Sequence, residues 1–178
     1  TWTVTVEDNA GNVGFDTSLA EVDGYPAISY YDQNIGRLMY ARSSVLDGSG
    51  TWTRASVDTN AGDVGWYTSL VVVNGNPAIS YWHSTNGDLK FARNSRSDAL
   101  GTWTITTVAS VGTVGLYTSL AVIGGNPAIS YYDSTNGDLK FVRNSAANGS
   151  GTWTSTTVDS PGNVGQYTSL AMVAGNPA

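Results

Sequence analysis

Aromatic and polar side chains stand next to each other at one recurring place in this sequence, a combination suited to holding a sugar ring. An aromatic ring stacks on the apolar face of a sugar, and a neighbouring carboxylate or imidazole bonds its hydroxyls. In three successive copies of a repeat, the pairs are Tyr31 and Asp32, Trp82 and His83, and Tyr132 and Asp133. A second position that changes between copies should share their rim, and it holds Phe15, Trp66, Leu116 and Gln166.

From these two positions we predict ligand binding by Trp66, Trp82, His83, Tyr132, Asp133 and Asp32. Ordinary surface residues with no ligand are the alternative, because single exposed aromatics are common on proteins.

Residues arranged for catalysis or metal binding are not found in the sequence. Glu7 and Glu21 are the only glutamates, and Glu21 falls at an apolar strand position of a divergent copy. No nucleophile elbow, phosphate loop or HExxH motif occurs. Segment 58–63 resembles a calcium loop faintly, but it lacks the glycine and glutamate that such a loop requires. We therefore expect no catalytic residue, no metal site, no cofactor and no enzymatic activity.

Composition excludes several classes of partner. The formal net charge is −6, and the 8 Lys and Arg form no basic stripe, which argues against nucleic-acid binding. The chain has no cysteine, so it has neither disulfides nor a thiolate metal site. No apolar run approaches the roughly 18 residues of a membrane helix. We expect an extracellular or cell-surface protein, secreted by a bacterium.

A unit of about 50 residues recurs along the chain and must position these side chains. Trp2, Trp52, Trp103 and Trp153 each lie in a TWT triplet, and VGxYTSL segments begin at Val64, Val114 and Val164, with the variant VGFDTSL at Val13. Each copy contains a short apolar run, a turn, a second run, an Asn-Gly hairpin signal, a third run and the TWT segment. Four strands per repeat of this length are typical of a β-propeller blade.

We therefore predict an all-β fold, a β-propeller segment of four-stranded antiparallel blades with about 3.5 repeats. A β-trefoil is the alternative, although its threefold barrel leaves no place for a fourth copy. The single domain spans 1–178, and its complete blades cover approximately 18–58, 69–109 and 119–159. An unpaired fourth strand is expected over 1–6, and an unfinished blade over 169–178.

The loop before each later TWT triplet resembles the Asp-box of sialidase-like propellers. The copies read DGSGTWT at Asp47, DALGTWT at Asp98 and NGSGTWT at Asn148, each with an acid or amide five residues before the tryptophan. The glycine two residues after that acid or amide in the family is replaced in every copy. The resemblance implies bacterial β-propeller repeat proteins with degenerate Asp-boxes, in which the polar residue stabilises a turn and Trp52, Trp103 and Trp153 pack between blades.

Three arginines, Arg42, Arg93 and Arg143, end the third strand of each complete copy. Sialidases bind a carboxylate with three arginines, but those come from unique positions rather than from one position per blade. We therefore expect these side chains to donate hydrogen bonds to loop carbonyls.

The function expected from these observations is a non-catalytic repeat domain for binding or scaffolding. A lectin with one rim site per blade and a sialidase-like glycoside hydrolase are the alternatives. Incomplete blades at both ends predict either a fragment of a larger ring or a homodimer in which 1–6 of one chain approaches 169–173 of the other. A glycan or a protein is the expected ligand, with no nucleic acid and no membrane span.

Overall fold

The computed structural model describes residues 8–9 and 11–178, and over these residues the protein consists of strands and turns without a helix. The strands are β1 (Val13–Val22), β2 (Tyr25–Asp32), β3 (Arg37–Ser43), β4 (Trp52–Asp58), β5 (Val64–Val73), β6 (Asn76–His83), β7 (Asp88–Asn94), β8 (Trp103–Ala109), β9 (Val114–Ile123), β10 (Asn126–Asp133), β11 (Asp138–Asn144), β12 (Trp153–Asp159), β13 (Met172–Val173) and β14 (Asn176–Pro177). Consequently, no helix among the described residues is long and apolar enough to cross a membrane.

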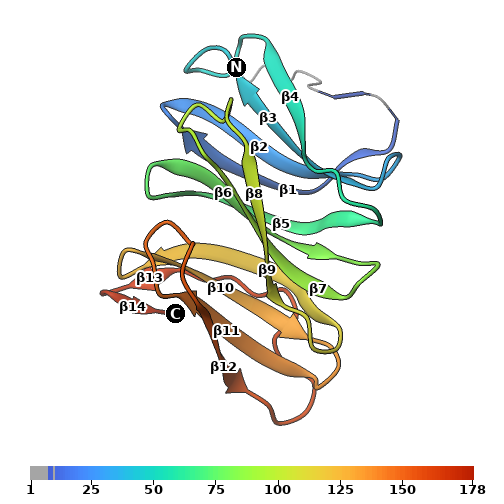
Figure 1. Ribbon diagram of the computed structural model, residues 1–178, viewed down its shortest axis with the longest axis vertical. Coiled ribbons are helices and arrows are strands. Elements are labelled where there is room, and N and C mark those ends of the chain that lie inside the picture. Colours follow the sequence, from blue (N-terminus) through green and yellow to red (C-terminus); the bar gives the residue numbers. More distant parts are fainter. Residues whose placement is uncertain (1–7, 10) are drawn as a thin grey trace, which may run out of the picture.

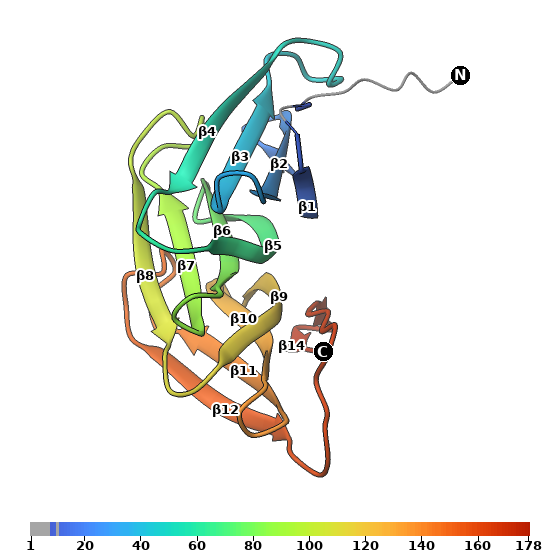
Figure 2. The same ribbon diagram turned by 90° about the vertical axis from the view of Figure 1, so that its right-hand side faces the viewer.

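The strands form three antiparallel four-stranded sheets, β1–β4, β5–β8 and β9–β12, each joined in chain order. The sheets stack face to face along the longest axis of the molecule (Figure 1). The first strands, β1, β5 and β9, follow one another on the concave side of an arc, and β4, β8 and β12 lie on its outer side (Figure 2). The predicted propeller segment is confirmed, and the β-trefoil alternative is wrong, because each repeat closes its own sheet instead of contributing to a shared barrel.

The first strand of each blade begins earlier than the apolar run alone indicates. β5 starts at Val64 rather than Ser69, and β9 starts at Val114 rather than Ser119. The added segment pairs with the second strand through two register shifts, one on either side of Trp66 in β5. A bulge of this kind bends a strand and redirects its side chains. The VGxYTSL segment, which looks like a connection in the sequence, is therefore the bulged half of the innermost strand.

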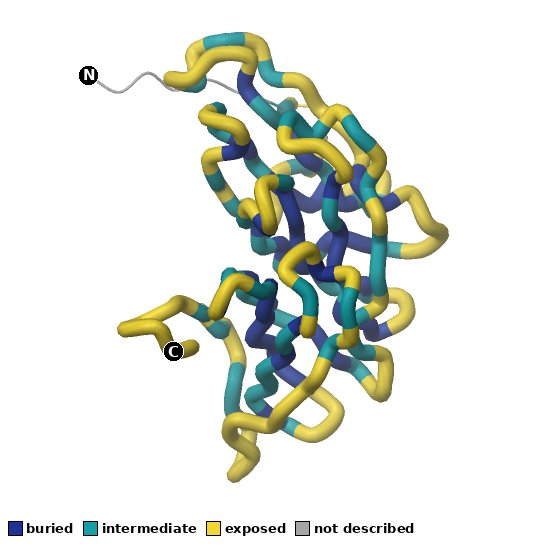
Figure 3. Tube along the Cα trace, turned by 60° about the vertical axis from the view of Figure 1, so that its left-hand side comes forward, coloured by how far each residue is buried: buried dark blue, intermediate teal, exposed yellow. Residues whose placement is uncertain are grey.

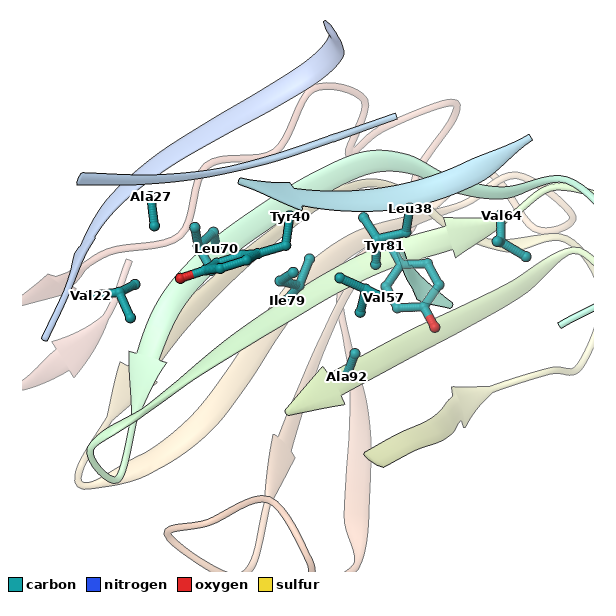
Figure 4. Close-up of a cluster of buried hydrophobic side chains, with 10 residues drawn as sticks. All are labelled: Val22, Ala27, Leu38, Tyr40, Val57, Val64, Leu70, Ile79, Tyr81 and Ala92. Carbon is teal, nitrogen blue, oxygen red and sulfur yellow. The ribbon is translucent and has the colours of Figure 1, made fainter. Parts of the chain in front are cut away.

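Two apolar layers hold the blades together. Figure 4 shows the first of them, in which Leu38 and Tyr40 of blade one face Ile79 and Tyr81 of blade two. The second layer joins blades two and three around Leu89, Phe91, Leu120, Ile129 and Tyr131. Buried stretches therefore run through the middle of the strands, while the turns are exposed (Figure 3). Neither face of the middle blade is left to solvent, as expected for a stacked repeat.

Threonine and serine of the YTSL segment connect neighbouring blades by hydrogen bonds. The Thr68 hydroxyl donates to the Asp16 carbonyl at 2.9 Å and shares a hydrogen bond with the Ser29 hydroxyl at 2.7 Å. Thr118 repeats both contacts one blade further along, with Tyr67 and Ser80. The hydroxyl–hydroxyl contacts are buried and the contacts to the carbonyls are partly buried, so these paired polar groups add to the apolar layers.

The glycine of each VG pair lets neighbouring blades approach closely. Gly115 has a φ of +99°, and a Cβ placed on it would lie 2.7 Å from both Cα and Cβ of Leu89 in the preceding blade. Gly14, in the first copy, has a φ of +87°, but none of the described residues lies within 4 Å of that position. Only glycine combines this backbone conformation with so short a contact.

The loop between the third and fourth strands has the polar turn predicted for it. Asp98 accepts a hydrogen bond from the Leu100 amide at 3.0 Å, and Asp47 and Asn148 accept the equivalent bond. Asn94, fully buried at the end of β7, closes the same loop by donating to the carbonyls of Ala99 and Gly101. The sequence analysis did not anticipate this asparagine, which recurs as Asn144 but is Ser43 in the first copy.

The repeated tryptophans and arginines have structural partners. Trp103 packs against Tyr40 with ring centroids 5.4 Å apart, and Trp153 packs against Phe91 at 5.2 Å, in each case across a blade boundary. The guanidinium groups donate to carbonyls at the end of the first strand, Val22 for Arg42, Val73 for Arg93 and Ile123 for Arg143.

The C-terminal segment is extended but mostly unpaired. Residues 164–170 form no strand, and the short β13 and β14 pair only with each other. The fourth strand predicted over 1–6 lies outside the described residues.

Candidate functional site: a tyrosine-lined groove on the concave side

One position of the innermost strand lines the concave side in every copy. It holds Asp16, Tyr67, Tyr117 and Tyr167, with φ angles of 50°, 56°, 54° and 56°. A bulky residue with positive φ is a rare conformation that costs free energy and clusters at functional sites. Asp16, Tyr67 and Tyr117 adopt it within the bulges of β1, β5 and β9, and Tyr167 adopts it in segment 164–170, which forms no strand. The recurrence of this conformation in four copies identifies the row as a candidate site.

The tyrosine rings follow one another closely along the row. The centroids of Tyr67 and Tyr117 are 4.5 Å apart, and those of Tyr117 and Tyr167 are 4.3 Å apart. Together with the threonine that follows each of them, they line a groove of about 270 Å³, whose wall is made of Asp16, Thr17, Tyr67, Thr68, Tyr117, Thr118, Tyr167 and Thr168. The groove offers tyrosine rings and the hydroxyl of Thr17, whereas the hydroxyls of Thr68, Thr118 and Thr168 are engaged between blades. Ring surfaces next to a polar group suit a ligand with both apolar faces and hydroxyl groups.

Among the residues that the structure describes, Asp16 is the only one with a charged side chain that lines this groove. Its Oδ2 accepts a hydrogen bond from the Tyr67 amide at 2.7 Å, while Oδ1 has no partner among the described residues. Burial raises the pKa of the Tyr67 hydroxyl, and the negative charge of Asp16 adds to the increase. The hydroxyl therefore stays protonated at neutral pH and is able to donate a hydrogen bond. The site thus combines one carboxylate with neutral donors.

The aromatic residues predicted to bind a ligand lie against this row. Trp66 stacks on Tyr31 with centroids 4.3 Å apart and donates from Nε1 to Asp63 Oδ2 at 3.0 Å. The ring centroids of Trp82 and Tyr67 are 6.0 Å apart, and those of Tyr132 and Tyr117 are 6.2 Å apart. The structure brings these predicted residues together with the tyrosines as a second aromatic layer, although none of the three lines the groove itself.

The polar residues predicted to bind a ligand are buried and closed into turns. Asp32 Oδ1 accepts from the Asn34 amide at 2.9 Å, His83 Nδ1 accepts from the Asn86 amide at 3.2 Å, and Asp133 Oδ1 accepts from the Thr135 amide at 3.1 Å. Their exposed fractions are 6%, 3% and 3%. None of them lines the groove.

The row that does line the groove was not predicted from the sequence. The tyrosine of YTSL recurs, and a residue that recurs in every copy is expected to serve the blade. One signal was nevertheless present, since Asp16 replaces that tyrosine in an otherwise similar segment. A change of residue type at a repeated position is the feature from which the groove was predictable.

A larger hollow of about 390 Å³ lies between blade three and the C-terminal segment. Its wall is mainly apolar, with Leu139, Phe141, Val158 and Leu170, and Lys140 is its only charged residue. Leu139 and Phe141 correspond to Leu89 and Phe91, which are buried by the next blade. The hollow is therefore an uncovered blade face. The described residues also contain no group of three or more His, Asp or Glu side chains placed to hold a metal ion.

Comparison with known proteins identifies the fold. No family model matches the sequence, and no curated protein matches it. Among solved structures, a family-43 β-1,3-galactosidase is similar, with a TM-score of 0.63 and 14% identity. The matched region covers 92% of this chain and 38% of the galactosidase chain. An endo-arabinanase from Bacillus licheniformis has a TM-score of 0.59 and 15% identity, with coverage of 92% and 63%. An α-L-arabinofuranosidase from Lactobacillus brevis has a TM-score of 0.54 and 12% identity, with coverage of 84% and 55%. The chain spans less than two thirds of the length of each.

These similarities contradict two expectations from the sequence, that the domain is non-catalytic and that it is not an enzyme. The neighbours that share its blade arrangement are glycoside hydrolases. The reasoning failed because recurring motifs report the residues that build each blade, whereas a catalytic residue occurs once and interrupts the repeat. At these identities the similarity itself establishes the propeller fold.

Proposed function

We propose that this chain is part of a glycoside hydrolase propeller, in which a saccharide lies in the concave groove and Asp16 supplies a reacting carboxylate. The observation that carries the proposal is the replacement of one member of the tyrosine row by Asp16, at the same backbone conformation as Tyr67, Tyr117 and Tyr167. A row of aromatic residues can bind a saccharide, and a carboxyl group among them can serve as one of the two that glycoside hydrolysis uses.

The tyrosines bind the saccharide in this proposal. Tyr67 and Tyr117 present aromatic faces on which sugar rings stack, and Tyr167, with 77% of its surface exposed, extends the row toward solvent. Thr17, next to Asp16, is exposed and makes no hydrogen bond among the described residues, so its hydroxyl is available to a sugar.

Asp16 transfers a proton. Its Oδ2 is held by the Tyr67 amide, so the carboxylate has a defined orientation, and Oδ1 is left for the ligand. Glycoside hydrolysis uses two carboxyl groups, one as acid and the other as base or nucleophile. The second carboxyl group is not among the residues that line the groove. We assign it to a further blade of the ring, in keeping with neighbours that are longer than this chain.

The test is turnover of a panel of aryl glycosides, including arabinofuranosides, galactosides and xylosides, by the whole protein. Asp16→Asn should lower the turnover rate by about 100-fold or more, because general acid–base catalysis contributes that much. The asparagine keeps an acceptor for the Tyr67 amide, so the fold is retained. Glu21→Gln removes the same charge from an exposed position of the same strand and should leave turnover unchanged. Absence of turnover on every substrate, or equal rates for Asp16→Asn and wild type, would refute the proposal.

Two finer features belong to the same proposal. The loops at Asp47, Asp98 and Asn148 are degenerate Asp-boxes, a reading supported by their place between the third and fourth strands and by their polar turns.

A bacterial protein that acts on polysaccharides works outside the cell, so we propose an extracellular or cell-surface location.

The uncovered blade face supports a proposal about partners. Leu139 and Phe141 are partly exposed, whereas the equivalent Leu89 and Phe91 are 0% and 2% exposed. We propose that another blade of the same repeat covers this face, supplied by a second copy of the chain. Light scattering at high concentration should give a mass above 18.6 kDa, and a monodisperse mass at that value would contradict the proposal.

A further inference from the structure

The lysines and arginines of the chain do not line the groove, although Arg54 lines a neighbouring hollow together with Thr17. The chain has 8 Lys and Arg, and none of them is among the residues that line the groove. Arg42, Arg93 and Arg143 donate to strand-end carbonyls. Lys90 pairs with Asp88, and Lys140 pairs with Asp138, each at 3.2 Å. An acidic sugar in the groove would therefore find no cation to compensate its charge.

The remaining three arginines are also engaged elsewhere. Arg54 pairs with Asp8 at 2.6 Å, Arg96 pairs with Asp98 at 2.5 Å, and Arg37 donates to the Asn60 carbonyl. The comparison with the arginine triad of sialidases thus fails in the structure as well, because no arginine converges on the concave side.

The groove instead carries a negative charge among aromatic rings. The carboxylate of Asp16 has one oxygen without a partner among the described residues, and Tyr67, Tyr117 and Tyr167 continue the wall from it. A carboxylate forms its strongest hydrogen bonds with a charged donor. The faces of aromatic rings attract a cation as well. Both features favour a ligand that carries a positive charge on a ring able to stack.

We infer that the groove selects saccharides that contain a free amine, such as glucosamine units, over neutral saccharides, and that it excludes acidic saccharides. The ammonium group lies beside the carboxylate of Asp16, whose Oδ1 remains directed at the bond that reacts, and the sugar rings lie along the tyrosine row. This inference rests on the proposed function and names the class of saccharide for the same groove.

The experiment measures binding of three oligosaccharides of equal length by calorimetry, at physiological salt. The oligomers are of glucosamine, which is cationic, of N-acetylglucosamine, which is neutral, and of galacturonic acid, which is anionic. The glucosamine oligomer should bind about tenfold more tightly than the neutral one, as expected for one charge-assisted hydrogen bond. The galacturonic acid oligomer should not bind measurably.

Two variants separate the groove from the overall charge of −6. Asp16→Asn should remove the preference for glucosamine, so that the glucosamine and N-acetylglucosamine oligomers bind this variant with affinities within about twofold of each other. Glu21→Gln removes an equal charge elsewhere on β1 and should leave the preference intact.

The outcomes distinguish this inference from the proposed function. Equal binding of the three oligomers, or tighter binding of galacturonic acid, overturns the inference and leaves the saccharide site standing. Loss of the preference in Glu21→Gln as well as in Asp16→Asn assigns it to net charge and also overturns the inference. If the protein binds none of the three oligomers and none of the neutral saccharides of the turnover panel, both this inference and the proposed function are overturned.

Discussion

Replacement of Gly115 by alanine tests whether blade packing requires the VG glycine. The added Cβ would lie 2.7 Å from the Cα and Cβ of Leu89, which has an exposed fraction of 0%. An L-residue in the left-handed region costs about 1–2 kcal/mol. Overpacking adds about 1–3 kcal/mol. Gly115→Ala should therefore lower the free energy of unfolding by about 2–5 kcal/mol. Gly14→Ala should cost only the first part, about 1–2 kcal/mol, because no residue in the described part of the chain lies within 4 Å of its Cβ position.

Urea denaturation followed by circular dichroism measures both variants. The midpoint should fall further for Gly115→Ala than for Gly14→Ala, with similar slopes. Gly65→Ala serves as a second test, since its Cβ would lie 2.6 Å from the Cα of Leu38 and its effect should match that of Gly115→Ala. Equal midpoints for Gly115→Ala and Gly14→Ala would contradict this reasoning. They would show that glycine is required for its backbone conformation alone, and not for the close approach of the blades.

Two further predictions concern the polar contacts between blades. Thr118→Val removes the hydroxyl that joins the Tyr67 carbonyl to Ser80, and it should lower the free energy of unfolding by about 1–3 kcal/mol. Thr17→Val at the equivalent exposed position of the first copy should change it by less than about 0.5 kcal/mol, and a loss equal to that of Thr118→Val would contradict the assignment. Burial opposes ionisation of Asp63, but hydrogen bonds from Tyr31, Trp66 and Ser84 outweigh it and hold the pKa of Asp63 below its usual value. The stability contributed by this carboxylate is thus present above its usual pKa of about 4 and is lost as the pH falls through the lower folded value. Thermal unfolding of Asp63→Asn should show a weaker decrease between neutral and acid pH than the wild type, and identical pH profiles would refute the role of Asp63.

Much of the blade was predictable because it depends on residues close together in the chain. The Asn-Gly pair at Asn86 indicated a hairpin, and β6 does pair with β7 from His83 and Asp88 outward. The arginine at the end of each third strand was expected to bond a carbonyl, and Arg93 bonds that of Val73. Asp98 was expected to stabilise its own turn, as it does. Each of these contacts involves neighbours along one sheet, which the period of the strands specifies.

The groove was not predictable in the same way. Asp32, His83 and Asp133 were expected on a rim, but they are buried because the turn after each second strand folds back over them. Asp16 and Tyr67 are 51 positions apart, and their contact depends on the rotation between two blades.

The repeat, the four strands of each copy and the turn chemistry between them follow from the sequence alone, because they depend on local propensity and hydrophobic periodicity. Which face of the first strand points to the concave side depends on the packing of the blades, which places one carboxylate in a row with three tyrosines. The physical reason is the bulge at Trp66 and its equivalents, which redirects side chains that the alternating pattern of a regular strand would place elsewhere. Because the blades stack, the presence of Asp16 in place of a tyrosine in one copy gives the groove a single negative charge.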